Sequence, residues 1–180
     1  MSNITAITSG PGTNGNCEAI VNALIDGAMG LSTNIINLLR LDRLKFITEC
    51  HQCAECAANN SCTIHDDLSD VLNTMEDSDC VIFSTCTVDG SLNQYMNALL
   101  TRVKSVFTGD KNKMAFIVVT CSEEKYGTKA TSDIKSVLVE SGFDIDSILI
   151  YADNNSKVAK DDDYIIAKAK RLGLSLRNTW

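Results

Sequence analysis

The 180-residue sequence is poor in proline, in long apolar runs and in positive charge, and each shortage excludes a class of protein. A single proline, Pro11, leaves no sign of a proline-rich linker or low-complexity segment. The longest apolar runs, such as residues 114–119, are far too short to cross a membrane. A formal net charge of −7 argues against nucleic acid as a partner, and it favours solubility and partners with a positively charged surface.

The N-terminal residues also lack the pattern of a secreted precursor, in which a charged segment precedes an apolar one. We therefore expect a cytoplasmic protein with no membrane association, and in such a compartment disulfides are rare. The apolar content of 44% and the charged content of 22% are ordinary for a globular protein. At this length they predict a single domain over residues 1–180.

Cysteine, by contrast, is abundant, and half of the eight cysteines lie in one short connector. Cys50, Cys53, Cys56 and Cys62 follow the spacing C-x2-C-x2-C-x5-C. Two-residue gaps let the thiolates of one tight turn converge on the same ion or cluster, and a longer gap supplies the fourth ligand. We therefore predict a metal-binding loop at about residues 45–65.

Three uses of these cysteines remain open. Disulfides suit a cytoplasmic protein least. Structural zinc accepts four thiolates, although its ligands more often come as two separated C-x2-C pairs. An iron–sulfur cluster is favoured, because three cysteines at two-residue gaps resemble the bacterial ferredoxin run. The five-residue final gap and Thr63 after Cys62 depart from that run, which predicts a cluster in a different fold.

The rest of the chain alternates short apolar runs with helical patterns. Strands are expected at residues 3–9, 33–41, 79–85, 114–121 and 147–152. Helices are expected after Gly15, from near Asp66, from Ser91, over residues 128–141 and from the acidic residues 161–163, which form the first turn of the last helix. Right-handed crossovers then give an α/β, flavodoxin-like three-layer sandwich. Its five-stranded parallel sheet has the order 2-1-3-4-5, with helices on both faces and the cysteine-rich loop after strand 2.

In such a sheet, ligands bind beyond the carboxyl ends of the strands, where the strand order reverses. Three loops meet there, at residues 9–17, 85–91 and 121–127. The first is glycine-rich and runs into a helix N-terminus, which suits a phosphomonoester, although similar loops also occur as simple turns. The candidate cofactor-binding residues are Ser9, Gly10, Thr13, Asn14, Gly15, Asn16, Cys17, Thr85, Cys86, Thr87, Val88, Asp89, Gly90 and Cys121.

Three segments together resemble the iron–sulfur flavoproteins, a group within the flavodoxin-like NADPH-dependent FMN reductase superfamily. They are Asn14-Gly15-Asn16 after residues 9–11, the cysteine run ending in residues 62–67, and Gly90-Ser91 leading to residues 96–102. The resemblance covers about residues 3–120. It implies FMN at the three loops and a 4Fe-4S cluster bound by Cys50, Cys53, Cys56 and Cys62.

The resemblance also implies a function. Proteins of this group are electron-transfer flavoproteins or FMN-dependent oxidoreductases that connect a one-electron donor, such as a ferredoxin, to two-electron chemistry at the flavin. They are usually homo-oligomers of anaerobes. A cluster on an exposed loop needs shielding from solvent and oxygen, and this need also favours a homo-oligomer.

The flavin loops depart from the family pattern. The family tends to carry Ser, Arg and Thr where this chain has Gly10, Gly12 and Cys17, and Pro-x-Tyr where it has residues 86–88. These differences predict weak FMN binding. They also leave two alternatives: a flavin-free, cluster-binding electron relay or docking subunit of a larger redox complex, and a zinc-stabilised interaction module.

The four remaining cysteines are expected to differ in role. Cys17, Cys86 and Cys121 are placed at the mouths of the three ligand loops, where they could form a second thiol-lined site. Cys80 lies inside an expected strand, and we interpret it as a small hydrophobic residue.

Overall fold

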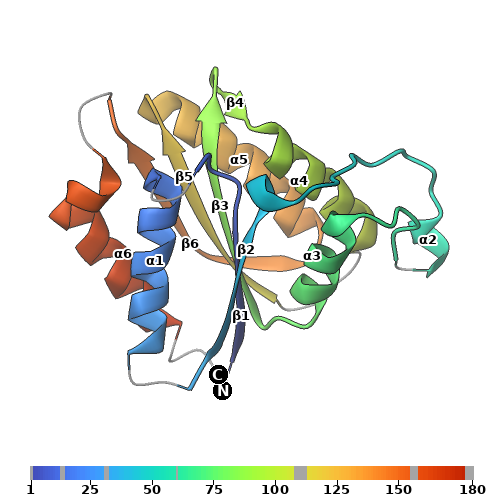
Figure 1. Cartoon of the computed structure of the whole chain (residues 1–180), viewed down its shortest axis with the longest axis horizontal. Helices are drawn as coiled ribbons and strands as arrows, with labels where there is room; N and C mark the ends of the chain where they lie inside the picture. Colours follow the sequence, from blue (N-terminus) through green and yellow to red (C-terminus); the bar gives the residue numbers. More distant parts are fainter. Residues whose placement is uncertain are drawn as a thin grey trace.

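The fold is described from a computed structural model over residues 2–12, 15–30, 33–59, 61–107, 113–154 and 158–176. Five strands run parallel in the order β2-β1-β3-β5-β6 (Figure 1). They are β1 (Asn3–Thr8), β2 (Ile35–Arg40), β3 (Cys80–Val88), β5 (Lys113–Cys121) and β6 (Phe143–Ala152). This order confirms the predicted flavodoxin-like sheet. The sheet also has a short sixth strand, β4 (Ser91–Leu92), antiparallel to β3, which the sequence did not predict.

Helices cover both faces of the sheet (Figure 1). One face carries α1 (Asn16–Met29) and α6 (Asp163–Ser175), and the other carries α3 (Asp67–Glu76), α4 (Gln94–Val106) and α5 (Glu124–Glu140). Short helical turns occupy the connections: η1 (Leu41–Arg43), α2 (Cys56–Asn59) and η2 (Ala159–Asp161). In the described part of the chain, no helix is long and apolar enough to cross a membrane.

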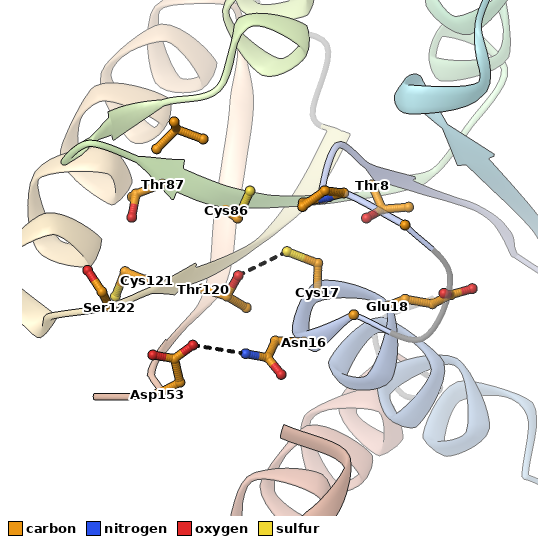
Figure 2. A pocket seen from close by; sticks show the side chains of 15 residues that line it. Thr8, Asn16, Cys17, Glu18, Cys86, Thr87, Thr120, Cys121, Ser122 and Asp153 are labelled. Atoms are coloured by element: carbon orange, nitrogen blue, oxygen red, sulfur yellow. Dashed lines mark hydrogen bonds between the residues drawn. The ribbon is translucent and has the colours of Figure 1, made fainter. Parts of the chain in front are cut away.

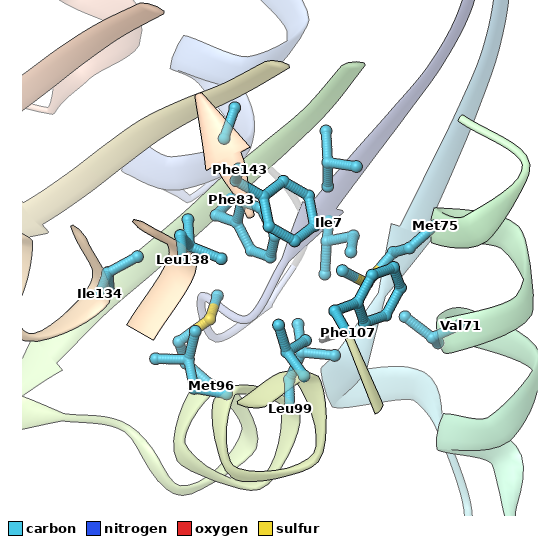
Figure 3. Packing of buried hydrophobic residues seen from close by; sticks show 14 of the residues in the cluster. Ile7, Val71, Met75, Phe83, Met96, Leu99, Phe107, Ile134, Leu138 and Phe143 are labelled. Carbon is cyan, nitrogen blue, oxygen red and sulfur yellow. The ribbon is translucent and has the colours of Figure 1, made fainter. Parts of the chain in front are cut away.

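The period-two pleat of the strands divides the apolar core between the two faces. On β3, Val81 and Phe83 point toward α3, α4 and α5, whereas Cys80 and Ile82 point toward α1 and α6. Phe83 packs edge-to-face on Phe143, with ring centroids 5.8 Å apart (Figure 3). Because both faces are covered, β3 needs apolar residues at successive positions, which is why its sequence reads as a continuous apolar run.

Two glycines bring α1 and α6 into backbone contact. A Cβ atom at Gly27 would lie 2.2 Å from the carbonyl oxygen of Lys170, and one at Gly173 would lie 2.0 Å from that of Leu24. Both distances are far below van der Waals contact, so any larger residue would force the helices apart. The C-terminal helix therefore fixes the position of α1.

The predicted start of the third helix was wrong. The helix was expected from Ser91, but Ser91 and Leu92 instead pair with the end of β3, and α4 begins at Gln94. A tight turn at Asp89 and Gly90, whose φ values are 49° and 75°, reverses the chain between the two strands. Asn93 then caps α4 by accepting a hydrogen bond from the Met96 N–H at 3.0 Å.

Two later boundaries were also predicted too far along the chain. α5 begins at Glu124 and not at residue 128, so Gly127 lies inside the helix. A Cβ at Gly127 would lie 2.5 Å from Ile150, so this glycine lets the helix pack closely on β6 and does not end it. β6 begins at Phe143 and not at residue 147. Its first residues, Phe-Asp-Ile-Asp, alternate apolar and acidic side chains, as expected for an edge strand with one face toward solvent.

Candidate functional site

Two adjoining cavities open at the carboxyl ends of the strands, beside the N-terminus of α1. The smaller has a volume of about 320 Å³ (Figure 2) and the larger about 550 Å³. They share Pro11, Gly12, Cys86 and Val88 in their walls. Each volume lies within the range of small-molecule sites, and the position is the one that the reversal of strand order predicts.

Most of the predicted cofactor-binding residues line these cavities. The smaller cavity is lined by Gly10, Gly15, Asn16, Cys17, Cys86, Thr87, Val88 and Cys121, and the larger one by Ser9, Cys86 and Val88. Thr85, Asp89 and Gly90 line neither. Thr85 is buried beneath the site, and the other two form the β3–β4 turn. Thr13 and Asn14 lie outside the described residues.

Asn93 organises the floor of the site, and the sequence analysis did not identify it. Besides capping α4, its side-chain amide donates to the Ser9 carbonyl oxygen at 2.9 Å and to Thr85 Oγ1 at 3.1 Å. Ser9 Oγ donates to the same Thr85 oxygen at 2.9 Å. This buried network joins the first loop to β3 and α4. An asparagine before an apolar helix is a common N-cap signal, but the misplaced helix start concealed it.

Two acidic residues also line the smaller cavity, and neither was predicted. Asp153 follows β6 and accepts a hydrogen bond from Asn16 Nδ2 at 3.3 Å, while Glu18 forms an ion pair with Arg40. No lysine or arginine is among the described residues that line either cavity. Carboxylates beside the N-terminus of α1 oppose the attraction of that helix end for a phosphate.

Two positions of the first loop are occupied by glycine for different structural reasons. Gly12 has a φ of 77°, in the left-handed region, and an added Cβ would meet no atom within 4 Å. An arginine there would have space but would strain the backbone. At Gly10 an added Cβ would lie 2.8 Å from Cys17 Sγ, so this glycine makes room for the cysteine.

Cys17, Cys86 and Cys121 all line the smaller cavity, in agreement with their predicted place at the mouths of the three ligand loops. Cys17 Sγ lies 3.1 Å from Thr120 Oγ1 (Figure 2), and Cys86 lies in the same cavity wall. The neighbouring Cys17 thiol lowers the pKa of Cys86 to about 6, whereas Cys86 and burial raise the pKa of Cys17. The Cys121 thiol instead donates to the Tyr151 carbonyl oxygen at 3.6 Å, and burial raises its pKa.

The four cysteines of the predicted metal-binding loop line a separate cavity of about 340 Å³. Cys50 Sγ lies 3.4 Å from Ser105 Oγ of α4, and Cys53 Sγ lies 3.9 Å from Thr63 Oγ1. Gln52 and Ala54 have φ values of 54° and 61°, which turn the chain sharply between the cysteines. In the described ranges, no three His, Cys, Asp or Glu side chains are arranged to hold a metal ion.

The loop ends at a buried ion pair. Arg102 of α4 has no exposed side-chain surface, and its Nη1 atom lies 2.5 Å from Asp66 Oδ1. Its Nη2 atom donates to the Ile64 carbonyl oxygen at 3.1 Å. Burial raises the pKa of the Asp66 carboxyl, but hydrogen bonds from Arg102 and from the Thr48 N–H, together with the charge of Arg102, outweigh this, so the pKa lies below its ordinary value. The ion pair therefore attaches the segment after Cys62 to α4.

The start of α3 and the burial of Cys80 agree with the sequence analysis. Asp66 precedes the first residue of α3 as its N-cap, and its N–H donates to Ser69 Oγ at 3.3 Å. His51 is exposed at the rim of the cysteine cavity. Cys80 is fully buried in β3, and burial raises the pKa of its thiol to about 12, as expected for a cysteine that acts as a hydrophobic residue.

Comparisons with known proteins agree with this architecture. The model of the family described as NADPH-dependent FMN reductase matches residues 2–152. An iron-sulfur flavoprotein of Methanocaldococcus jannaschii is 22% identical over 187 residues, which cover 94% of this chain and 93% of the relative.

Solved structures show the same fold. The structure of a flavone reductase superposes with a TM-score of 0.78 at 15% identity, and the match covers 98% of this chain and 62% of that chain. An NAD(P)H:quinone oxidoreductase from Methanothermobacter marburgensis superposes with a TM-score of 0.75, also at 15% identity, covering 97% of this chain and 96% of that chain.

Proposed function

Because the chain belongs to the NADPH-dependent FMN reductase family, we propose that it is an electron-transfer flavoprotein or oxidoreductase that couples a 4Fe-4S cluster to FMN. One observation carries this proposal: in a chain of a flavin family, four cysteines of one loop line a single cavity. The similarity to an iron-sulfur flavoprotein, which extends over nearly the whole chain, supports it.

The strand-end cavities fit FMN in position and in shape. Val88, Leu92 and Tyr95 give the larger cavity apolar and aromatic walls that suit a flat ring and exclude water from it. Gly15, the N-cap of α1, has no side chain to occupy the N–H groups of the first turn, so these groups suit a phosphate. When bound, FMN would supply both one-electron and two-electron chemistry.

The cysteine cavity fits an iron–sulfur cluster by its donor set. Cys50, Cys53, Cys56 and Cys62 supply four soft thiolates, the ligands that iron–sulfur clusters and zinc prefer. A bound cluster would supply one-electron transfer. The protein's own contribution is to hold the ends of the loop, with Ser105 beside Cys50 and the Arg102–Asp66 ion pair after Cys62.

We also propose a homo-oligomer and a ferredoxin-like or other redox partner. Cys53 and His51 are exposed, so a cluster at this loop needs cover from solvent and oxygen, and a second subunit is the simplest cover. The net charge of −7 favours a redox partner with a positive surface. A monomeric mass by light scattering on anaerobically prepared, cluster-loaded protein would contradict the oligomer.

A second candidate function is a flavin-free electron relay or docking subunit. Asp153 favours it, because this carboxylate lines the cavity in which a phosphate would bind, whereas the charge of Glu18 is paired with Arg40. In this function the cysteine loop would carry a cluster while the strand-end cavities remained without flavin.

Anaerobic purification followed by assays of iron, sulfide, zinc and acid-released flavin distinguishes these functions. We expect iron and sulfide in equal amounts, with substoichiometric FMN that is restored when FMN is added in excess. Iron and sulfide without flavin binding, even at millimolar FMN, would support the relay. Zinc in place of iron and sulfide would contradict both and would support a zinc-stabilised interaction module.

A further inference from the structure

We propose that Cys86 and Cys17 form a thiol–disulfide exchange centre that reacts with low-molecular-weight disulfides entering the smaller strand-end cavity. Cys86 is the attacking thiol and Cys17 the resolving thiol. This activity goes beyond the proposed electron transfer, and it needs neither flavin nor cluster.

The two thiols are brought together by elements that are distant in the sequence. Cys86 lies opposite Thr120 in the β3–β5 register, and Cys17 Sγ lies 3.1 Å from Thr120 Oγ1. Neighbouring strands are about 4.8 Å apart, so Cys17 reaches the end of β5 right beside Cys86. Both thiols line the smaller cavity, where Figure 2 shows Cys86 near Cys17 and Thr120.

The pair is asymmetric, as an exchange centre requires. Cys17 is only 4% exposed, whereas Cys86 is partly exposed and lines both cavities, so an incoming disulfide meets Cys86 first. Asn93 Nδ2 donates to Cys86 Sγ at 3.6 Å, and the Cys17 thiol is the other neutral donor beside it. These donors stabilise the Cys86 thiolate, in agreement with its pKa of about 6.

The activation comes from neutral donors and not from a cation. The charged side chains that line the surrounding cavities are Glu18, Asp153 and Asp42, and all are acidic. Acidic neighbours would raise the pKa of a thiol, so the lowered pKa of Cys86 comes from neutral groups: the Cys17 thiol, the Asn93 amide and the Cys86 backbone N–H.

The reaction balances in two exchange steps. The Cys86 thiolate attacks one sulfur of a disulfide RS–SR, the S–S bond breaks, and one RS⁻ leaves and takes a proton from water. Cys17 then loses its proton and attacks the Cys86 sulfur of the mixed disulfide, which releases the second RS⁻ and forms the Cys17–Cys86 disulfide. The substrate gains two electrons and the cysteine pair loses two. An added dithiol returns the pair to its reduced form by the reverse steps.

The test uses the full chain and bis(2-hydroxyethyl) disulfide, with acid quenching and peptide mapping by mass spectrometry. The wild type should accumulate the Cys17–Cys86 disulfide. Cys17→Ser should stop at a stable mixed disulfide on Cys86, and Cys86→Ser should show neither product. The matched control is Cys80→Ala, because Cys80 is buried in β3 and lines neither cavity, and it should react as the wild type does.

The pH dependence provides a readout that a merely structural role would not change. At pH 6, Cys86 should react about tenfold faster than an ordinary exposed thiol, because its larger thiolate fraction outweighs its lower nucleophilicity. Cys17→Ala should remove this advantage at low pH. A persistent mixed disulfide on Cys86 in the wild type, or an unchanged pH profile in Cys17→Ala, would overturn the proposal. Either result would leave the proposed electron transfer untouched.

Discussion

The two groups of cysteines differ in what holds their thiols in place. Cys17 and Cys86 sit on a helix and a central strand, and their sulfur atoms are hydrogen-bonded to Thr120 and to Asn93 respectively. The four cysteines of the loop between β2 and α3 sit around one four-residue helix, and their thiols are not arranged around a common metal position. The fold alone sets the geometry of the first group, whereas we expect a bound metal centre to complete that of the second.

The largest expected effect concerns the loop. Replacing Cys50, Cys53, Cys56 or Cys62 singly with Ala should abolish the cluster, because each change removes one of four thiolate ligands. Cys80→Ala is the matched control, since Cys80 is buried in β3 and does not line the cysteine cavity. Iron and sulfide analysis of anaerobically purified variants provides the measurement, and an intact cluster in any of the first four would show that the ligand assignment is wrong.

The next effect concerns the anchor of the loop. Arg102→Met should lower the free energy of unfolding by about 3–5 kcal/mol, because it leaves the buried Asp66 carboxylate without its partner. Denaturant unfolding measures this loss. Arg102→Met combined with Asp66→Asn should recover part of it, since the unpaired charge is then absent, and no recovery would contradict the ion-pair explanation.

The same ion pair predicts a pH dependence. The pKa of Asp66 is lowered in the folded state, so its stabilising effect is fully present above the unfolded value of about 4 and is lost as the pH falls through the folded pKa. Asp66→Asn should therefore cost most stability near neutral pH and progressively less in acid. A difference from the wild type that does not change between pH 7 and pH 3 would contradict this assignment.

A smaller effect is expected at the floor of the strand-end cavities. Asn93→Ala should cost about 2–4 kcal/mol of stability, because it removes the cap of α4 and takes the side-chain donor away from the buried Ser9 carbonyl oxygen. It should also weaken FMN binding, since the first loop loses its anchor. Asn93→Asp separates the two causes, because it keeps the cap and removes the donor. Denaturant unfolding and fluorescence titration with FMN are the measurements.

The smallest effect concerns the charge of the cavity. Asp153→Asn should tighten FMN binding about fivefold, which corresponds to roughly 1 kcal/mol, because it removes one negative charge near the phosphate position. Asparagine can still accept the hydrogen bond from Asn16, so the backbone should not move. An unchanged dissociation constant in a titration at low salt would show that Asp153 does not face the phosphate.

The sequence predicted the sheet because its strands are buried on both faces and read as continuous apolar runs. It misplaced α4, because a two-residue strand such as Ser91–Leu92 has no periodicity to detect. The family resemblance was confirmed, because the family model matches residues 2–152, although the flavin loops of this chain differ from the family pattern.

The sequence predicted the site residues that carry a local signal, and it missed those whose role depends on distant contacts. The cavity-lining residues that lie next to glycines or at strand ends, such as Asn16 and Cys86, could be found from local sequence. Asn93, Asp153 and Arg102 could not, because their importance comes from contacts with residues 84, 137 and 36 positions away in the chain.

The contact between Gly27 and Gly173 limits how the strand-end site can adapt to a ligand. Backbone pressed against backbone leaves α1 no room to slide along α6 or to move toward it. A ligand that differs in length or charge cannot be accommodated by a shift of this helix. Adjustment must come from residues 10–12 or from the β3–β4 hairpin, so variation in ligand preference among related chains should concentrate in these two segments while the helix pair stays constant.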